Sequence, residues 1–243
     1  MDEVIAFVTA RSGSKSIIDK NLQKIGNKSL LEWTAACISK CSVFHKSIIS
    51  TDSIKYAEEV SPYKVEAPFL RPERFAQDTS TDSDVFFHFV SWLQTNSRVP
   101  KWIAHFRPTT PFRDPSLIDL MVSNFIAESK NRDWTAARSV HLMSESAYKF
   151  FEIDQGDQLV SIFERKPDLD RSNMPKESFP KTYIPNGYID LINTHHFLQK
   201  GKLHGDRVKA LVTVPTLEID SKQDLLHANL MNSSNTNLMS SVF

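Results

Sequence analysis

The chain has 243 residues, of which 40% are hydrophobic and 24% are charged, and its formal net charge at pH 7 is zero. A chain of this size suits one α/β domain, or one domain with a small subdomain, around a packed core. A protein that coats nucleic acid or lies on a membrane surface needs a basic excess, so the neutral balance argues against both classes.

The amino-terminal residues and the cysteines favour a cytoplasmic protein without a membrane partner. No window approaches the stretch of about 18 apolar residues that a transmembrane helix requires. The start, Met1-Asp2-Glu3, lacks the basic region of a signal peptide. Cys37 and Cys41 lie four positions apart in an expected helix, which is more typical of buried thiols than of a redox or metal pair. A reducing compartment fits this cysteine usage.

Apolar runs alternate with helical patterns along the chain, which predicts an α/β fold with a mostly parallel sheet and helices on both faces. The expected strands are residues 4–9, 46–50, 102–106, 134–140, 188–192 and 210–214. The expected helices cover residues 29–40, 54–60 and 81–95, and two more begin near Pro115 and Ser221. Ser29 and Glu32 form a capping box at the first helix, and Asp114 caps the helix that begins at Pro115.

Three segments depart from this alternation. Residues 144–185 are rich in aromatic side chains, charges and prolines, and we expect a β-arm inserted in the main domain of residues 1–143 and 186–231. Residues 61–79 contain several prolines and form a long loop, and loops of that length are usually functional. Residues 232–243 are rich in Asn and Ser, which predicts a disordered tail.

The loop after the first strand carries Arg11, Lys15 and Lys20 around a turn of small residues, 12–14. Free N–H groups in a tight turn and several cations suit a polyphosphate, and open α/β sheets bind ligands at the carboxyl ends of their strands. The loop has neither the spacing of a Walker A motif nor the glycines of a dinucleotide fingerprint. The alternative interpretation is an ordinary basic surface loop.

Seven segments of the chain occur in an order that resembles the acylneuraminate cytidylyltransferase family, or CMP-sialic acid synthetases. They are the Arg/Lys loop and residues 50–52, 69–72, 78–79, 107–111, 185–187 and 218–221, within a similarity that extends over about residues 3–231. The resemblance implies a Rossmann-like nucleotide-diphospho-sugar transferase fold and a homodimer. It also implies that the arm serves dimerisation by reaching over the partner's active site.

The resemblance also implies which residues bind CTP. It assigns the triphosphate to Arg11 and Lys20, as catalytic residues, and places Ser14, Lys15 and Asn21 beside them. Arg71 stands where the family reads cytosine, and its planar set of donors suits the base. The alternative for Arg71 is an ion pair with Glu73. One hydroxyl among residues 79–83, taken here as Ser80, is expected to contact phosphate or base.

Glu218 and Asp220 form a pair of carboxylates two positions apart. In an extended segment such residues project to the same face, and Mg²⁺ binds one or two carboxylates together with phosphate oxygens. We therefore expect Asp220 to be a catalytic Mg²⁺ ligand and Glu218 to be a second one, although the family usually has Asp at both positions. The alternative is an acidic strand end that caps the last helix.

The residues expected on the acceptor side are Arg107, Thr109, Lys149, Arg171 and Asn186. Members that use sialic acid commonly have Gln where Arg107 stands. Either the acceptor carries an additional anion or acceptor group there, or Arg107 pairs with a protein carboxylate. Lys149 and Arg171 are expected to come from the partner subunit, and the alternative for both is ordinary solvated charge.

We therefore interpret the chain as a Mg²⁺-dependent nucleotidyltransferase that transfers CMP from CTP to the anomeric hydroxyl of a sialic-acid-like 2-keto-3-deoxy sugar acid and releases pyrophosphate. Because of Arg107, a cytidylyltransferase for a phosphonate or another small acidic acceptor is the main alternative. A GT-A glycosyltransferase fits less well, because a nucleotide-sugar donor does not need the cationic loop. An inactive CMP-sugar binder is the last alternative, since the longer Glu218 side chain can misplace a metal and cost ~10²-fold in rate.

Overall fold

The computed structural model describes residues 3–163 and 169–234. Its central element is a six-stranded sheet with strand order β10-β6-β9-β5-β1-β4. The strands are β1 (Val4–Thr9), β4 (Lys46–Ser50), β5 (Trp102–Phe106), β6 (Ala136–Leu142), β9 (Tyr183–Asn193) and β10 (Val208–Thr213). β1 is parallel to β4 and β5, and β10 is parallel to β6, whereas β9 is antiparallel to both of its neighbours. The predicted α/β fold with a mostly parallel sheet is confirmed.

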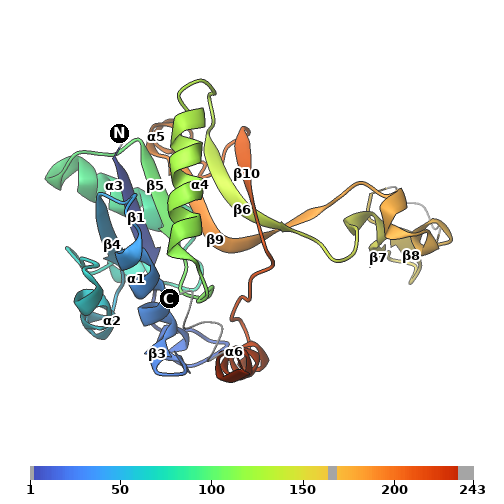
Figure 1. Ribbon diagram of the computed structural model, residues 1–243, viewed down its shortest axis with the longest axis horizontal. Coiled ribbons are helices and arrows are strands. Elements are labelled where there is room, and N and C mark those ends of the chain that lie inside the picture. Colours follow the sequence, from blue (N-terminus) through green and yellow to red (C-terminus); the bar gives the residue numbers. More distant parts are fainter. Residues whose placement is uncertain (1–2, 164–168, 235–243) are drawn as a thin grey trace.

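Helices cover both faces of the sheet (Figure 1). α1 (Leu30–Lys40), α2 (Ile54–Val60) and α4 (Pro115–Glu128) pack on one face, and α3 (Asp82–Asn96) and α5 (Thr194–Lys200) pack on the other. In β1, Val4, Ala6 and Val8 face the first group of helices, and Ile5 and Phe7 face the second. Successive side chains of a strand point to opposite faces, so a strand buried on both faces needs a continuous apolar run.

Cap residues mark where the helices next to the sheet edge begin. The predicted capping box of α1 is confirmed, since Ser29 and Glu32 each accept a hydrogen bond from the other's backbone N–H. A second box, between Thr81 and Asp84, starts α3. Asp114 accepts from the N–H of Ser116 at the start of α4. These caps fix the positions at which the chain turns from the sheet edge into a helix.

Most of the predicted arm, residues 144–185, lies away from the sheet, whereas its last residues, 183–185, belong to β9. The paired ends of β6 and β9, where Leu142 lies opposite Tyr183, extend past the rest of the sheet. They lead into a small lobe (Figure 1). The lobe contains η4 (Ala147–Lys149), β7 (Phe151–Ile153), β8 (Leu159–Ser161), η5 (Arg171–Asn173) and η6 (Lys176–Ser178), and β7 pairs antiparallel with β8.

Some elements differ from the sequence-based prediction. The apolar pattern does not predict α5 or the short hairpin of β2 (Lys24–Ile25) and β3 (Lys28–Ser29). The long loop contains the turns η2 (Ser61–Tyr63) and η3 (Glu73–Phe75), and η1 (Lys20–Leu22) follows the Arg/Lys loop. α6 (Lys222–Ser234) includes the first residues of the expected tail, so disorder is wrong for 232–234, and 235–243 lie outside the described residues. No helix among the described residues is long and apolar enough to cross a membrane.

Candidate active site

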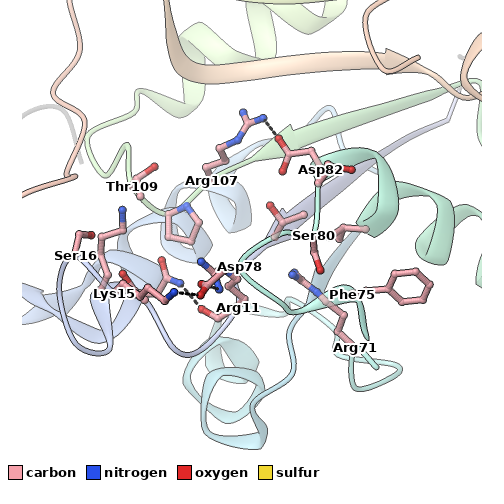
Figure 2. A pocket seen from close by; sticks show the side chains of 17 residues that line it. Arg11, Lys15, Ser16, Arg71, Phe75, Asp78, Ser80, Asp82, Arg107 and Thr109 are labelled. Carbon is pink, nitrogen blue, oxygen red and sulfur yellow. Dashed lines mark hydrogen bonds and ion pairs between the residues drawn. The ribbon is translucent and has the colours of Figure 1, made fainter. Parts of the chain in front are cut away.

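A cavity of about 500 Å³ opens where β1 and β5 end (Figure 2). Its walls come from the loop after β1, the segment before α3 and the loop after β5. Among the residues that the sequence places in the site, those lining the cavity are Arg11, Ser14, Lys15, Lys20, Asn21, Arg71, Ser80, Arg107 and Thr109. The carboxyl edge of the parallel strands therefore carries both the nucleotide-side and part of the acceptor-side residues, as such sheets generally place their ligands.

Polar contacts hold the loop after β1 in place. Ser12 donates its backbone N–H and its hydroxyl to the two oxygens of Asp52, at 2.8 and 2.6 Å. Asn21 is buried and donates to the carbonyl oxygen of Arg11 at 3.1 Å. Gly13 has a φ of 72°, a backbone conformation that glycine adopts without strain. The Arg/Lys loop is thus fixed at its turn and at its far end.

Each cation of this loop pairs with a carboxylate. Arg11 Nη1 lies 2.8 Å from one oxygen of Asp78, and Lys15 contacts the other. Lys20 Nζ lies 2.9 Å from Asp220 Oδ1. Hydrogen bonds from Lys15 and Arg11 lower the pKa of Asp78. These carboxylates engage the same N–H donors that phosphate oxygens would use.

Arg71 is a buried arginine with a fixed orientation. Its Nε donates to Ser50 Oγ at 2.9 Å, its Nη2 donates to the carbonyl oxygen of Ser50, and its own N–H donates to Thr51 O. Burial lowers the pKa of Arg71 to about 10, so the side chain stays charged at neutral pH. Among the described residues no ion pair joins Arg71 to Glu73. In Figure 2, Arg71 lies near Phe75 and Ser80, across the cavity from Ser16.

Glu218 and Asp220 reach the same region from the other end of the chain. Ile219 between them is buried and both acidic residues are exposed, so the extended segment projects both carboxylates to one side. The N–H of Ile219 donates to Thr109 O at 2.8 Å, and Thr109 Oγ1 lies 3.4 Å from Glu218 Oε1. The start of α6 is capped by Ser221, whose hydroxyl accepts from the N–H of Asp224, while Asp224 accepts from the N–H of Ser221, so neither carboxylate of the pair is needed there.

The two carboxylates suit Mg²⁺ by their chemistry. Both present hard oxygens, and Mg²⁺ commonly takes one or two protein carboxylates and completes its shell with phosphate oxygens and water. Within residues 3–163 and 169–234, no group of three or more His, Cys, Asp or Glu side chains could hold a metal by itself. A metal at Glu218 and Asp220 would therefore depend on a bound nucleotide for further ligands.

A small apolar cluster lies beneath these charged groups. Ile17 of the Arg/Lys loop, Leu30 of α1, Ile219 and Ala228 of α6 are buried together. Burial of this apolar surface stabilises the approach of the two segments. It explains how Lys20 and Asp220, which are 200 positions apart in the chain, come into contact.

Arg107 is held between two carboxylates. Its Nη2 lies 2.6 Å from Asp82 Oδ2, and its Nη1 lies 3.2 Å from Asp190 Oδ2. Of the two expectations for Arg107, pairing with protein carboxylates is the arrangement that the structure contains. Burial alone would raise the pKa of Asp190, but the nearby imidazole of His204, whose Nε2 lies 3.5 Å from Asp190 Oδ2, and the charge of Arg107 lower it to about 2. Burial lowers the pKa of His105 to about 3, so that imidazole is neutral.

Three residues expected on the acceptor side do not line the cavity. Asn186 is buried, and its amide donates to Thr213 Oγ1 at 2.6 Å. Lys149 lies in η4 of the arm, 3.3 Å from Glu145, and Arg171 lies in η5. The arm extends away from the central sheet and its helices (Figure 1), and neither Lys149 nor Arg171 lines the cavity, so their roles stay predictions that require a second subunit.

Sequence reasoning does not select Arg113, although it joins the loop after β5 to β9 beside the cavity. This buried arginine donates to the carbonyl oxygens of Tyr188, Arg107 and Gly187 at 2.7, 2.8 and 2.9 Å. Gly187 has a φ of 65°, and a Cβ there would lie 2.8 Å from Thr110 Oγ1. The close packing leaves room only for glycine, and Arg113 ties the loop after β5 to β9. The sequence contains no signal for this role beyond a charge after a strand.

Comparisons with known proteins identify relatives of this chain. A family model described as cytidylyltransferase matches residues 5–160, which is more than half of the chain. An N-acylneuraminate cytidylyltransferase of Escherichia coli is 30% identical over 224 residues, covering 91% of this chain and 50% of that protein. A pseudaminic acid cytidylyltransferase of Campylobacter jejuni is 22% identical over 229 residues, covering 93% and 95%. The chain therefore spans about half the length of the Escherichia coli relative.

One solved structure shares the fold. It is that of a CMP:2-keto-3-deoxy-manno-octonic acid synthetase complexed with CTP, with a TM-score of 0.64 and 12% sequence identity. The alignment covers 96% of this chain and 99% of that one. At this identity the similarity shows a common architecture, including the sheet edge at which the cavity lies.

Proposed function

The chain belongs to the cytidylyltransferase family, and from this premise we propose that it transfers CMP from CTP to the anomeric hydroxyl of a sialic-acid-like 2-keto-3-deoxy sugar acid. The names of the Escherichia coli and Campylobacter jejuni relatives support this class of acceptor. The observation that carries the proposal is the convergence of the cationic loop and the carboxylate pair at one sheet edge, where Lys20 contacts Asp220 at 2.9 Å.

The reaction is an in-line displacement at the α-phosphorus of CTP. The sugar oxygen forms a bond to phosphorus, and the bond to the oxygen that bridges to the β-phosphate breaks, so pyrophosphate leaves. Positioning and neutralisation of charge supply most of the rate in such reactions. Arg11 and Lys15 bind the triphosphate in exchange for Asp78, and Lys20, whose ammonium has three N–H donors, binds it while keeping its ion pair with Asp220. Arg71, whose Nη1 is not engaged by Ser50, offers that nitrogen to the acceptor atoms of cytosine.

Glu218 and Asp220 are the residues proposed to hold Mg²⁺. When bound, the ion neutralises charge on the phosphate oxygens as a Lewis acid. Lys20 keeps the carboxylate of Asp220 oriented toward the Arg/Lys loop through their ion pair. Thr109 holds Glu218 and the backbone of Ile219 against the loop after β5.

The proposed enzyme is a homodimer in which the arm of each chain lies over the cavity of its partner. The arm is suited to an interface because many of its apolar side chains are exposed, among them Tyr148, Phe150, Ile153, Leu159 and Phe163. In this arrangement Lys149 and Arg171 of one chain approach the acceptor carboxylate in the other chain's cavity.

The test of the proposed function is a pyrophosphate-release assay with CTP, Mg²⁺ and a panel of sugar acids that includes N-acetylneuraminate, legionaminate, pseudaminate and an octulosonate. We expect release with CTP and at least one acceptor, and a CMP-sugar of matching mass. Arg11→Ala should abolish release, whereas Lys55→Ala, an exposed residue of α2, should not change it. Turnover of a UDP-sugar without CTP would point to a glycosyltransferase instead.

A further inference from the structure

The acceptor side of the cavity contains a charge pair that the proposed function leaves without a role. Figure 2 shows Arg107 and Asp82 together on one side of the cavity and Arg11, Lys15 and Asp78 on the other. The two cations of the second group, Arg11 and Lys15, bind the triphosphate in the proposed function. The Arg107–Asp82 pair therefore lies on the side that is left for the acceptor.

The guanidinium of Arg107 is already satisfied by protein carboxylates. Each terminal nitrogen contacts one of them, Asp82 at 2.6 Å and Asp190 at 3.2 Å. Among the described residues Arg107 Nε makes no hydrogen bond, and it is the guanidinium nitrogen attached to the aliphatic part of the side chain. An anionic group of the acceptor would have to compete with both carboxylates, and one of them, Asp190, is buried. A phosphate or phosphonate substituent at this place would therefore be disfavoured.

Asp82 is the member of this network that reaches the cavity most openly. Its side chain is 42% exposed, against 25% for Arg107 and 2% for Asp190. Asp82 Oδ2 accepts the hydrogen bond from Arg107, and Oδ1 accepts none from any residue that the structure describes. The capping box of Thr81 and Asp84 fixes the backbone at this first turn of α3. The cavity thus presents a positioned carboxylate oxygen that can only accept hydrogen bonds.

We propose that Asp82 determines which acceptor is used, by accepting a hydrogen bond from a hydroxyl or amide N–H of the sugar acid. Arg107 is a positioning residue that holds the Asp82 carboxylate. This inference rests on the proposed function and narrows it: the acceptor presents a neutral donor group to Asp82, and no second anion. A site built to bond a substrate donor rejects analogues that lack it, because its own polar group is then left unpaired.

The first experiment uses the wild-type enzyme and the best acceptor of the panel. Analogues that lack one hydroxyl or acylamino group at a time are compared by kcat/KM, together with one that carries a phosphonate. We expect one deletion to reduce kcat/KM by ~10- to 100-fold, the usual value of a hydrogen bond to a charged group. The phosphonate should also be a poorer acceptor than the parent. Equal use of all deletion analogues, or preference for the phosphonate, would overturn the inference.

The second experiment repeats the comparison with variants. Asp82→Ala should use the sensitive analogue and the parent acceptor about equally, and Asp82→Asn should be intermediate, while KM for CTP stays close to that of the wild type. Arg107→Gln should weaken the discrimination, and Arg107→Lys should restore part of it. Asp78→Asn is the matched carboxylate control on the nucleotide side, and it should change KM for CTP but leave the acceptor preference intact.

The outcomes separate the two proposals. If the wild type releases no pyrophosphate with CTP and any sugar acid, the proposed function is wrong, and this inference falls with it. If the wild type is active but Asp82→Ala discriminates between acceptors as the wild type does, only the role of Asp82 is wrong. Thermal unfolding of each variant shows whether a change in kcat/KM belongs to a folded protein, and the analogue series on the wild type needs no variant at all.

Discussion

A single carboxylate, Asp78, affects how strongly the cations of the cavity can bind phosphate. It pairs with both Arg11 and Lys15 and belongs to the segment that leads from Arg71 to α3. A triphosphate that binds these cations has to replace one anion with another. The binding free energy of the triphosphate is therefore smaller than these cations would give without Asp78. Binding would also separate the segment around Asp78 from the Arg/Lys loop.

The first prediction concerns this exchange. Asp78→Asn removes the competing charge, so we expect CTP to bind about 2- to 5-fold more tightly, in line with the modest contribution of exposed ion pairs. Isothermal titration calorimetry with CTP measures the effect, and the gain should shrink at high salt. Weaker binding would show that Asp78 supports the nucleotide and does not compete with it.

Asp220 supports a second prediction at the same scale. Asp220→Asn should lower kcat by at least ~10²-fold, because it removes one electrostatic contact to the transition state. Binding of CTP without Mg²⁺ should change much less, and the remaining activity should no longer respond to Mg²⁺ concentration. Asp133→Asn, an exposed carboxylate outside the cavity, is the control and should leave the Mg²⁺ dependence intact.

His105 supports a prediction about pH. It is buried next to Thr9, and burial lowers its pKa to about 3, whereas an unfolded histidine has a pKa near 6.5. Between these values the unfolded chain binds a proton at this residue and the folded chain does not. Stability is therefore lost as the pH falls, by about 2 kcal/mol between pH 7 and pH 5 from this residue. Urea unfolding should show a shallower pH dependence in His105→Gln, and an unchanged slope would contradict the assignment.

At the scale of elements, the apolar cluster around Ile17 and Ile219 joins the first loop of the chain to its last helix. The carboxylates of Glu218 and Asp220 beside it are exposed, and ion pairs with an exposed partner contribute little to this docking. The position of the acidic segment thus depends on the packing of a few aliphatic side chains and on the backbone hydrogen bond between Ile219 and Thr109.

The prediction for this element is a loss of activity beyond the loss of stability. Ile219→Ala should lower the free energy of unfolding by about 2–5 kcal/mol, as buried Ile→Ala changes do. It should also reduce kcat at temperatures where the variant is folded, because Glu218 and Asp220 are no longer held. Ile118→Ala is the matched control: Ile118 is equally buried in α4 but lies away from the carboxylates. Equal kcat in the two variants would contradict the proposed role of the cluster.

Most helices and strands could be predicted from local patterns. The box at Ser29 and the Asp114-Pro115 start are visible in the sequence, and the structure has α1 and α4 there. The direction of β9 could not be predicted, because a strand buried on both faces has the same apolar run in either orientation. α5 is short and follows β9 without a break, so its start is hidden in the preceding apolar pattern.

In the candidate site, too, some features could be predicted from the sequence and others could not. Its cations and the acidic pair could be chosen because each follows a strand and matches a motif. The partners of Arg107 could not be predicted, because Asp82 and Asp190 lie 25 and 83 positions away in the chain. They contact Arg107 only after the chain has folded. The role of Arg113 depends on the carbonyl oxygens of Arg107, Gly187 and Tyr188 in two segments, and backbone acceptors cannot be identified from residue types.

At the scale of the whole molecule, the arm is the feature whose position is not stabilised by packing on the core. It extends from β6 and β9 without packing on the helices of its own chain (Figure 1). Exposed apolar side chains such as Phe150, Ile153 and Phe163 cost free energy in water, and an interface with a second subunit would bury them.

The prediction for the assembled molecule is complementation between two inactive variants. Arg171→Ala carries its defect on the arm, and Arg11→Ala carries its defect in the cavity. If the arm serves the partner's cavity, subunit exchange in an equal mixture should restore activity at about one quarter of the sites, since half of the dimers are mixed and each mixed dimer has one intact site. Pyrophosphate release after mixing measures this. No recovery in a mixture shown to contain mixed dimers would mean that each arm serves its own chain.

The contact between Lys20 and Asp220 also has a consequence for protein synthesis. The Arg/Lys loop leaves the ribosome early, but the acidic segment and α6 emerge only after almost all of the sheet has been translated. Ile17, Ile25 and Leu30 therefore stay uncovered on the nascent chain until that moment. Translation arrested just before residue 217 would give a chain that contains all six strands of the sheet, with these apolar side chains exposed beside β1 and without the two carboxylates proposed to hold Mg²⁺.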